Sequence, residues 1–310
     1  MKVLFYFIKR NTKLYFKDRG LFFSSLITPL ILLILYSTFL RNIFLDNITG
    51  SIQSMPFKID AKLLSGIADG QIVASILSVS SVTVSFFCSM RMVKDKSNET
   101  EKDLLVSPIN PSLIQIGYFL SALLSVFLVF FFSSLLCLIY LSFTGFYLSV
   151  TDVFLILLDV FSLCVFGTLL SSLSYSFLRS DSQAGAVSTI ISCAYGFLSG
   201  AYMPIHGFSS WLRNSLMFLP STYGTNIIKN HALRGVFARL KEAGLKEEAI
   251  AGLKDSFDLN LYLFENRIDE KTAYTVFYLS ILLLFLLYFL LHIFRTRATR
   301  NTSQKQKSAM

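Results

Sequence analysis

The sequence predicts an all-α polytopic membrane protein whose six helices cross the bilayer. Of its 310 residues, 54% are apolar and 15% are charged, whereas soluble domains carry roughly one quarter charged residues. The charges lie in short blocks between long uncharged runs, and each run reaches the roughly 18 residues that a spanning helix needs. These runs are 20–40, 70–90, 104–151, 160–178, 182–212 and 272–294. A soluble fold is excluded because its surface would need more charge.

Basic residues gather at both ends of the chain, and they account for much of the net charge of +9. The clusters are Lys2, Lys9, Arg10, Lys13, Lys17 and Arg19 before the first run, and Arg295, Arg297, Arg300, Lys305 and Lys307 after the last. In multi-pass proteins, the short loops and tails that are rich in Lys and Arg stay on the cytoplasmic side. We therefore expect a protein of the plasma membrane with both termini in the cytoplasm, and no nucleic-acid partner.

Residues 1–19 have the spacing of an amphipathic helix. At 100° per residue, one arc holds Lys2, Lys9, Arg10, Lys13 and Lys17, and most of the opposite face is filled by Val3, Leu4, Phe7, Ile8, Leu14 and Tyr15. Such a helix lies in the membrane interface, with its lysines against anionic headgroups. The alternative is a disordered basic leader.

The first run contains Pro29, which predicts a kink, and residues 41–69 then form a first external loop. The second run carries a stripe of small or hydroxyl-bearing residues at steps of three or four: Ala74, Ser78, Ser81, Ser85 and Ser89. Such a stripe permits close helix contact. A polar lining of a translocation path is the second interpretation.

Charge is densest between Arg91 and Asp103, where eight of thirteen residues are charged. The block runs into Leu104 and Leu105, and then into Pro108 and Pro111, which stop a helix. The segment 91–111 is therefore interpreted as a short helix on the inner surface. A solvated loop whose charges only fix the topology explains the composition equally well.

Asp159 lies early in the fourth run and is a possible intramembrane charge. Ionised groups in membranes usually face protein or water, so a functional role is one interpretation. In the other, the carboxylate reaches the headgroups at the outer edge.

The fifth run has a small residue at every fourth position, which puts Ala184, Ser188, Ser192, Gly196 and Gly200 on one helix face. A face of this kind lets another helix approach closely. We expect it to form a packing or translocation interface.

Residues 203–271 form a long outer segment. Its first part, together with the preceding Tyr202, holds Pro204, Trp211 and Pro220. It is too broken for a full span, so we expect a re-entrant or interfacial helix with Trp211 as an anchor. The second part reads as an external helical cap with breaks at Gly244 and Gly252. Asp255, Asp258 and Asn260 do not fit a calcium loop and are interpreted as a solvated turn.

Motifs of catalysis and metal binding do not occur in this sequence. The phosphate loop, the nucleophile elbow and the HExxH pair are all missing, and the four cysteines fall inside predicted spans. We therefore expect no catalytic residues, no metal and no directly bound cofactor. Uphill transport by this chain would need energy from another chain.

Two segments resemble the permease subunits of type-2 ATP-binding-cassette exporters. Residues 99–108, ETEKDLLVSP, look like the coupling segment of these permeases. Residues 198–204, LSGAYMP, together with Trp211, Leu212 and FLPSTY at 218–223, look like the end of span five and the outer re-entrant segment. The order of elements is similar over nearly the whole chain.

This resemblance implies a single type-2 membrane domain over 1–310, working as a homo- or heterodimer with two copies of a cytosolic ATPase that holds ATP and Mg²⁺. It implies that Glu99, Glu101, Lys102, Asp103, Leu104 and Leu105 couple the permease to that ATPase. The substrate would be an amphiphile, namely a drug, an antimicrobial peptide or a lipid-like molecule. The Gly-Thr pair common in the coupling segment is missing, and the outer loop is longer than usual.

Two other classes of membrane protein have sequence patterns of their own. A membrane-embedded lipid-modifying enzyme would need clustered His, Asp or Arg near one interface, which Asp159 alone does not supply. A secondary transporter or channel would show inverted repeats and several intramembrane ionisable groups. Neither pattern is visible in the sequence.

Overall fold

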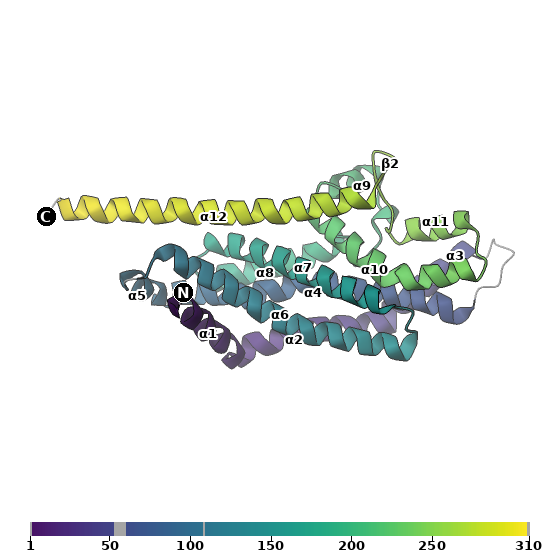
Figure 1. The fold of residues 1–310 in the computed structure, drawn as a ribbon, viewed down its shortest axis with the longest axis horizontal. Helices are drawn as coiled ribbons and strands as arrows, with labels where there is room; N and C mark the ends of the chain where they lie inside the picture. Colours follow the sequence, from purple (N-terminus) through teal and green to yellow (C-terminus); the bar gives the residue numbers. More distant parts are fainter. Residues whose placement is uncertain (1, 53–59, 108, 309–310) are drawn as a thin grey trace.

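The computed structural model describes residues 2–52, 60–107 and 109–308, and it is almost entirely helical (Figure 1). The helices are α1 (Lys2–Lys17), α2 (Arg19–Leu35), a π-helical turn (Tyr36–Leu40), α3 (Arg41–Ile52), α4 (Ala61–Ser97), α5 (Thr100–Val106), α6 (Pro111–Thr144), α7 (Val150–Ser176), α8 (Asp181–Leu198), a 3₁₀ turn (Ile205–Gly207), α9 (Ser210–Leu216), α10 (Pro220–Glu242), α11 (Glu247–Ser256) and α12 (Glu270–Ser308). A small antiparallel hairpin of β1 (Leu261–Leu263) and β2 (Asn266–Ile268) departs from the predicted all-α fold.

Five helical segments of the described residues are long and apolar enough to cross a membrane, whereas the sequence predicts six. They are Arg19–Asp46, Ala61–Ser97, Pro111–Thr144, Val150–Ser176 and Glu270–Ile293. The predicted run 182–212 is the one that contains no candidate spanning helix. Its helix, α8, ends at Leu198 because Gly200 adopts a left-handed conformation (φ 71°) and Pro204 follows.

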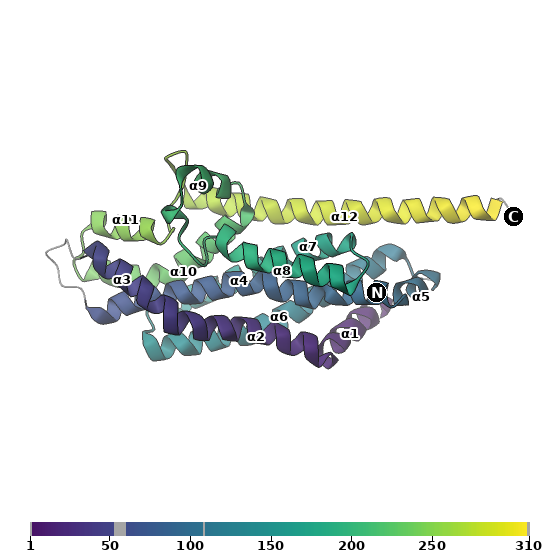
Figure 2. The ribbon, with the colours of Figure 1, turned by 180° about the vertical axis from the view of Figure 1, so that it is seen from behind.

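Helix α4 forms the centre of the bundle and packs against α2, α6, α7, α8 and α10. The cap formed by α3, α11 and the far end of α10 lies at one end of the molecule, which we call the cap end (Figures 1 and 2). Helix α5 lies at the opposite end, the α5 end, together with α1 and the C-terminal part of α12. Helix α8 starts at the α5 end and α10 continues towards the cap end, so these two helices follow one another along the length of the bundle (Figure 2).

Polar residues placed just before the helices start several of them. The carboxylate of Asp60 accepts the Lys62 N–H at the start of α4, and the amide oxygen of Asn110 accepts the Ser112 N–H beside Pro111. Helix α7 begins with a reciprocal capping box between Ser149 and Asp152. These local signals explain why long apolar helices start where they do.

Helix α4 is fixed at each end by a buried carboxylate. At the cap end, Asp69 accepts hydrogen bonds from Arg41 Nε at 2.8 Å and from the Tyr140 hydroxyl at 2.9 Å. At the α5 end, Asp95 is held by Arg10, Arg91 and Tyr118. Arg91 belongs to α4 itself, but the other partners come from other helices, so α4 is tied to the N-terminal helices and to α6 at both ends.

The predicted amphipathic helix is confirmed as α1, but its apolar face is shared between protein and surroundings. Phe7, Asn11 and Tyr15 are buried, whereas Val3 is exposed. The Phe7 ring covers Gly117 of α6, and the Tyr15 hydroxyl lies 2.5 Å from Ser25 Oγ of α2. Part of this face therefore packs on the bundle rather than on lipid.

Most of the predicted external loop 41–69 is helical. The π-helical turn continues α2 into α3, and α4 begins at Ala61, while residues 53–59 of this predicted loop lie outside the described residues. In the cap, Gly244 separates α10 from α11 as expected. The break expected at Gly252 is wrong, because this residue lies inside α11, where the space around it is open.

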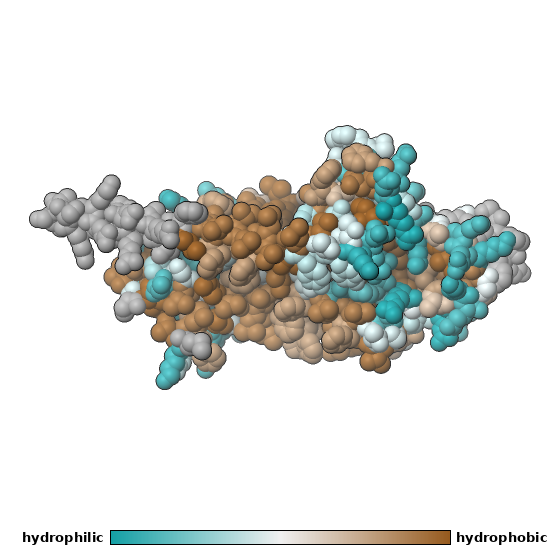
Figure 3. Space-filling view, turned by 45° about the horizontal axis from the view of Figure 1, so that its top comes forward, coloured by the Kyte–Doolittle hydropathy of each residue, from teal (hydrophilic) through white to brown (hydrophobic). Residues whose placement is uncertain are grey.

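The surface divides into an apolar belt and a polar cap (Figure 3). Brown side chains cover the middle of the molecule, and teal side chains gather at the cap end. Large apolar side chains of α2, α6, α7 and α12 are exposed in the belt. A belt of this extent is expected where lipid replaces water as the solvent, and the helices satisfy their backbone hydrogen bonds internally.

Candidate coupling end and cap pocket

Helix α5 is a short charged projection at the α5 end of the bundle. It begins after Glu99, whose φ of 61° turns the chain away from α4. Lys102 and Glu99 form an exposed ion pair at 2.5 Å, and Asp103 is exposed as well. Val106 is 87% exposed, whereas Leu104 packs against the buried cluster around Phe7 and Tyr118.

The six residues predicted to couple are thus brought together on one seven-residue helix and its cap. Leu104 anchors this helix to the bundle, and Gln115 Nε2 donates to Glu101 Oε1 at 3.4 Å. The remaining predicted side chains, including the 45% exposed Leu105, face outward. Pro108 of the same motif lies outside the described residues, as do the side chains of the basic cluster from Arg295 to Lys307.

The first half of the charged block has a different environment, because it continues α4 instead of forming a separate element. Asp95 is 0% exposed, with Arg10 Nη1 at 3.2 Å and the Tyr118 hydroxyl at 2.8 Å from its Oδ2. Arg91, one turn earlier, contacts the other carboxylate oxygen. A buried carboxylate needs such partners to compensate for lost hydration.

Two lysines of this block reach further helices. Lys94 Nζ lies 2.6 Å from Asp18 Oδ2, between α1 and α2, and this hydrogen bond lowers the pKa of the Asp18 carboxyl below its ordinary value. Lys96 Nζ donates to the carbonyl oxygens of Tyr175 at 2.9 Å and Ser176 at 3.2 Å, at the end of α7. A cation there complements the negative end of the helix dipole.

The α5 end therefore consists of an exposed charged helix on a base of paired charges. The base joins α4 to α1, α6 and α7 through Asp95, Lys94 and Lys96. Helix α5 follows α4 after two residues, so the chain itself joins α5 to this base.

The small residues of α4 lie inside the bundle. Ser78 Oγ and Thr225 Oγ1 of α10 are 2.6 Å apart, and both are buried. Ser81 and Ser85 are 0% exposed, and a Cβ added to Gly167 of α7 would lie 2.7 Å from Ser85 Oγ. This geometry is that of close helix packing within one chain.

The small-residue ladder of α8 does not face one helix along its length. Ala184 and Ser188 are buried and Ser192 is half-buried. A Cβ added to Gly196 would lie 2.3 Å from the Tyr202 ring, which belongs to the turn after α8. The last position, Gly200, offers its carbonyl oxygen to Lys229 Nζ at 2.8 Å.

The predicted re-entrant segment is a set of short pieces. Tyr202 is half-buried, Pro204 precedes the 3₁₀ turn, and α9 is only seven residues long. Trp211 is 75% exposed, as an anchoring residue requires. Pro220 occupies the first turn of α10, where its missing N–H costs no hydrogen bond, so it opens a long helix.

Asp258 was interpreted as part of a solvated turn, and this interpretation is wrong. The residue is buried, and its carboxylate accepts the N–H groups of Ile205 at 2.6 Å and His206 at 2.9 Å. Lys229 Nζ of α10 lies 3.6 Å from the same carboxylate. Burial lowers the pKa of Lys229, and the nearby Asp258 opposes that shift. This ion pair holds the turn after α8 against α10.

Asp159 also has a buried partner, so the interpretation in which it reaches the headgroups is wrong. Its Oδ2 lies 2.5 Å from His231 Nδ1 of α10, and the Tyr274 hydroxyl of α12 lies 3.0 Å from His231 Nε2. A neutral imidazole satisfies both contacts, with its Nδ1–H donating to Asp159 and its Nε2 accepting from Tyr274. The three side chains connect α7, α10 and α12.

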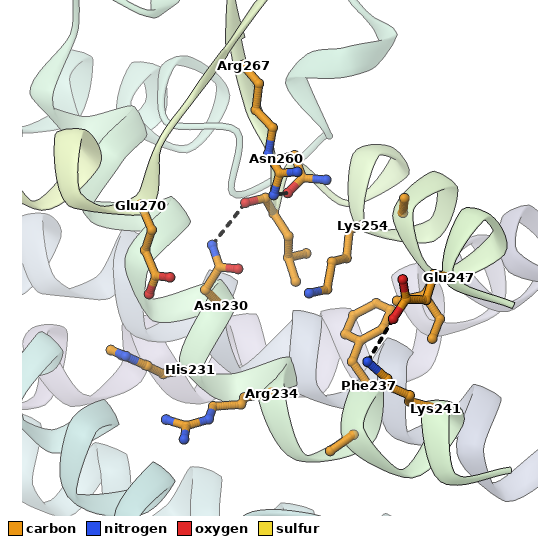
Figure 4. Close-up of a pocket in the computed structure, with 14 residues that line it drawn as sticks. Asn230, His231, Arg234, Phe237, Lys241, Glu247, Lys254, Asn260, Arg267 and Glu270 are labelled. Carbon is orange, nitrogen blue, oxygen red and sulfur yellow. Dashed lines mark hydrogen bonds and ion pairs between the residues drawn. The ribbon is translucent and has the colours of Figure 1, made fainter. Parts of the chain in front are cut away.

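A pocket of about 540 Å³ opens beside His231 at the cap end (Figure 4). Its walls come from α10, α11, the β-hairpin and the start of α12, and Lys254 points into the space between them (Figure 4). The charged or polar lining residues include Asn230, His231, Arg234, Lys241, Glu247, Lys254, Asn260, Arg267 and Glu270. We call this site the cap pocket.

Sequence reasoning missed most of the paired charges. Arg91 and Asp95 carry a local signal, since they are four residues apart on one helix. Lys229 with Asp258 and His231 with Asp159 have none, because their partners lie on other elements. Within residues 2–52, 60–107 and 109–308, no group of three His, Cys, Asp or Glu side chains converges as metal ligands.

A family model described as ABC-2 type transporter matches residues 2–230, which is more than half of the chain. No curated protein matches the chain significantly.

Proposed function

Because the chain belongs to the ABC-2 type transporter family, whose membrane domain is a permease without an ATPase domain, we propose that it is the membrane subunit of an ATP-driven exporter. As a member of this family, the chain is a multi-pass membrane protein and a permease component. Permeases of the family generally pair with ATPase subunits, and those partners use ATP.

We propose that two copies of an ATPase subunit and a second permease complete the transporter. ATP and Mg²⁺ would be held by the ATPase, and this chain would contribute the surface on which the ATPase acts. The proposed surface is α5, because it is exposed, charged and anchored to the bundle through Leu104 and Glu101. Charges on such a surface determine partner choice and register more than affinity.

The proposed mechanism follows from what lies beneath α5. Closure of the ATPase pair would push on α5 and move the end of α4. Asp95 and Lys96 would pass that movement to α1, α6 and α7. This network is the single observation that best supports the role, because a merely topological charge block would not need buried partners on three other helices.

The proposed orientation places the α5 end in the cytoplasm. Arg10, Arg91, Lys94 and Lys96 all lie at this end, together with the other lysines of α1. Basic residues that flank membrane helices favour the cytoplasmic side. The cap end and the segment around Trp211 would then lie at the outer surface of the plasma membrane.

We propose that residues 231–310, which lie beyond the matched part, belong to the same domain. Helix α12 packs against α6, α7 and α10, so it completes the bundle. The proposed substrate is an amphiphile that moves outward, in line with the apolar belt and a pocket at the cap end that has both charged and apolar walls.

The test is a pair of charge reversals on α5. Glu99→Lys with Glu101→Lys is expected to detach the ATPase or to uncouple ATP hydrolysis from transport, while the protein stays inserted and folded. The matched control is Glu248→Lys with Glu265→Lys, two exposed residues of the cap. ATPase co-purification and transport are measured at equal membrane abundance. If the α5 variant behaves like the control, α5 is a topological anchor and the proposed coupling fails.

A further inference from the structure

The cap pocket contains two cations, Lys254 and Arg267, that form no ion pair with a carboxylate of the described residues. Lys241 pairs with Glu247 at 2.8 Å, and Arg234 lies 3.5 Å from Asp152. Among the ion pairs of the described residues, neither Lys254 nor Arg267 takes part. Lys254 Nζ lies 5.6 Å from the centre of the Phe237 ring, and Arg267 Nη2 donates to Asn260 Oδ1 at 2.7 Å.

Two acidic residues near these cations have structural roles of their own. Asp255 Oδ1 accepts hydrogen bonds from Asn260 Nδ2 at 2.7 Å and from the Tyr262 hydroxyl at 3.0 Å. Glu270 lies in the first turn of α12, where a carboxylate stabilises the positive end of the helix dipole. In Figure 4 its side chain lies on the opposite side of Asn230 from Lys254. The pocket lining holds four cationic side chains, Arg234, Lys241, Lys254 and Arg267, and two carboxylates, Glu247 and Glu270, so its net charge is positive.

The same pocket has an apolar wall. Phe237, Ile250 and Leu259 line it and are otherwise buried in the cap. A small hydrated anion would need only the cations. A positive centre next to apolar side chains suits a molecule that carries both an anionic group and an apolar part.

The position of the pocket indicates where such a molecule comes from. Its floor residue, His231, is bonded to Asp159 and Tyr274, which belong to two candidate spans. Glu270, at its edge, is the first residue of the last candidate span. The pocket thus lies where the apolar belt ends, which is the level of lipid phosphate groups.

We infer that the cap pocket binds the phosphate group of an anionic lipid from the adjacent leaflet, with Lys254 and Arg267 on the phosphate and the Phe237 wall along the apolar part. Hydrogen bonds between charged groups are the strong ones, so these two side chains would supply most of the selectivity. This inference does not depend on transport or on the ATPase, and it holds for either orientation of the chain.

Binding is measured by calorimetry on the full chain in a neutral detergent. The probes are dihexanoyl-phosphatidylglycerol, its phosphatidylcholine counterpart and inorganic phosphate. We expect one saturable site for phosphatidylglycerol, at least tenfold tighter than for phosphatidylcholine. Lys254→Gln with Arg267→Gln should weaken phosphatidylglycerol binding by about a hundredfold, since each of the two lost charged hydrogen bonds accounts for roughly one factor of ten.

The matched control is Lys62→Gln with Lys246→Gln, which removes two exposed charges of the cap end outside the pocket. It should bind like the wild type. Equal binding by the pocket variant and this control overturns the inference, as does equal affinity for the two lipids. If inorganic phosphate binds as tightly as phosphatidylglycerol, the site binds a free anion, and the inference that its ligand is a lipid is overturned. Melting temperatures of all variants, and the two single substitutions, separate lost binding from lost folding.

Discussion

Single residues decide how closely the end of α8 packs against the turn that follows it. Gly196 lies directly under the Tyr202 ring, and the positions where a Cβ would stand are already occupied. Gly185 is on the same helix, but the space around it is open. The two glycines therefore share a helix and differ only in their surroundings, which makes them a matched pair.

Replacing Gly196 by Ala should destabilise the protein by about 1–3 kcal/mol, because the Tyr202 ring must move to admit the methyl group. Gly185→Ala should be neutral or slightly stabilising, since alanine is the better helix former. Thermal unfolding of both purified variants measures the difference. Adding Tyr202→Ala should restore part of the stability lost in Gly196→Ala. Identical melting of the two single variants would show that Tyr202 does not cover Gly196.

Charged residues inside the bundle were the hardest to predict from the sequence. The sequence marks Asp159 as a possible intramembrane charge, but its partner is 72 positions away in the sequence. The partner of Lys229, Asp258, was placed in a solvated turn. Such pairs are formed by the tertiary fold, and neither periodicity nor local spacing records them.

Among the elements, the spanning helices were predicted well from the long uncharged runs. The helix in the charged block was predicted less well from its density of charge. Five of the six predicted runs correspond to α2, α4, α6, α7 and α12. The charged block divided into two parts, because α4 continues through Asp95 and only the residues after Glu99 form α5. The polar composition of α10 suggested an external helix. Its first turns are instead buried against α4 and α7, where other helices satisfy the polar groups.

The contact between α1 and α4 gives a prediction about these two elements. Asp95→Asn removes the charge that holds Arg10 and Arg91, so α1 should separate from the bundle more easily. The loss should be about 2 kcal/mol or more, since a hydrogen bond to a charged group contributes roughly 1.5–3 kcal/mol. Faster tryptic cleavage within α1 would report the separation.

Asp103→Asn is the control for this experiment, because it removes the same charge from the exposed helix α5. Its cleavage rate should equal that of the wild type. If Asp95→Asn is also cleaved at the wild-type rate, Asp95 does not fix α1 to α4.

For the whole molecule, the proposed orientation can be tested by labelling. In a background without the four cysteines, single cysteines at positions 97 and 248 occupy exposed sites at opposite ends. An impermeant thiol reagent applied to intact cells should label position 248 and leave position 97 unlabelled until the membrane is permeabilised. The reverse pattern would place the α5 end outside and contradict the proposed docking of a cytosolic ATPase.

The two carboxylates that fix α4 also define a length. Residues 69 and 95 are 26 positions apart, which corresponds to about 39 Å along a helix, close to the roughly 40–45 Å of a bilayer with its headgroups. A free helix adapts to a thinner bilayer by tilting, but α4 is bonded to neighbours at both ends and cannot tilt alone. Hydrophobic mismatch must then be absorbed by the lipid, so the protein favours membranes of one thickness.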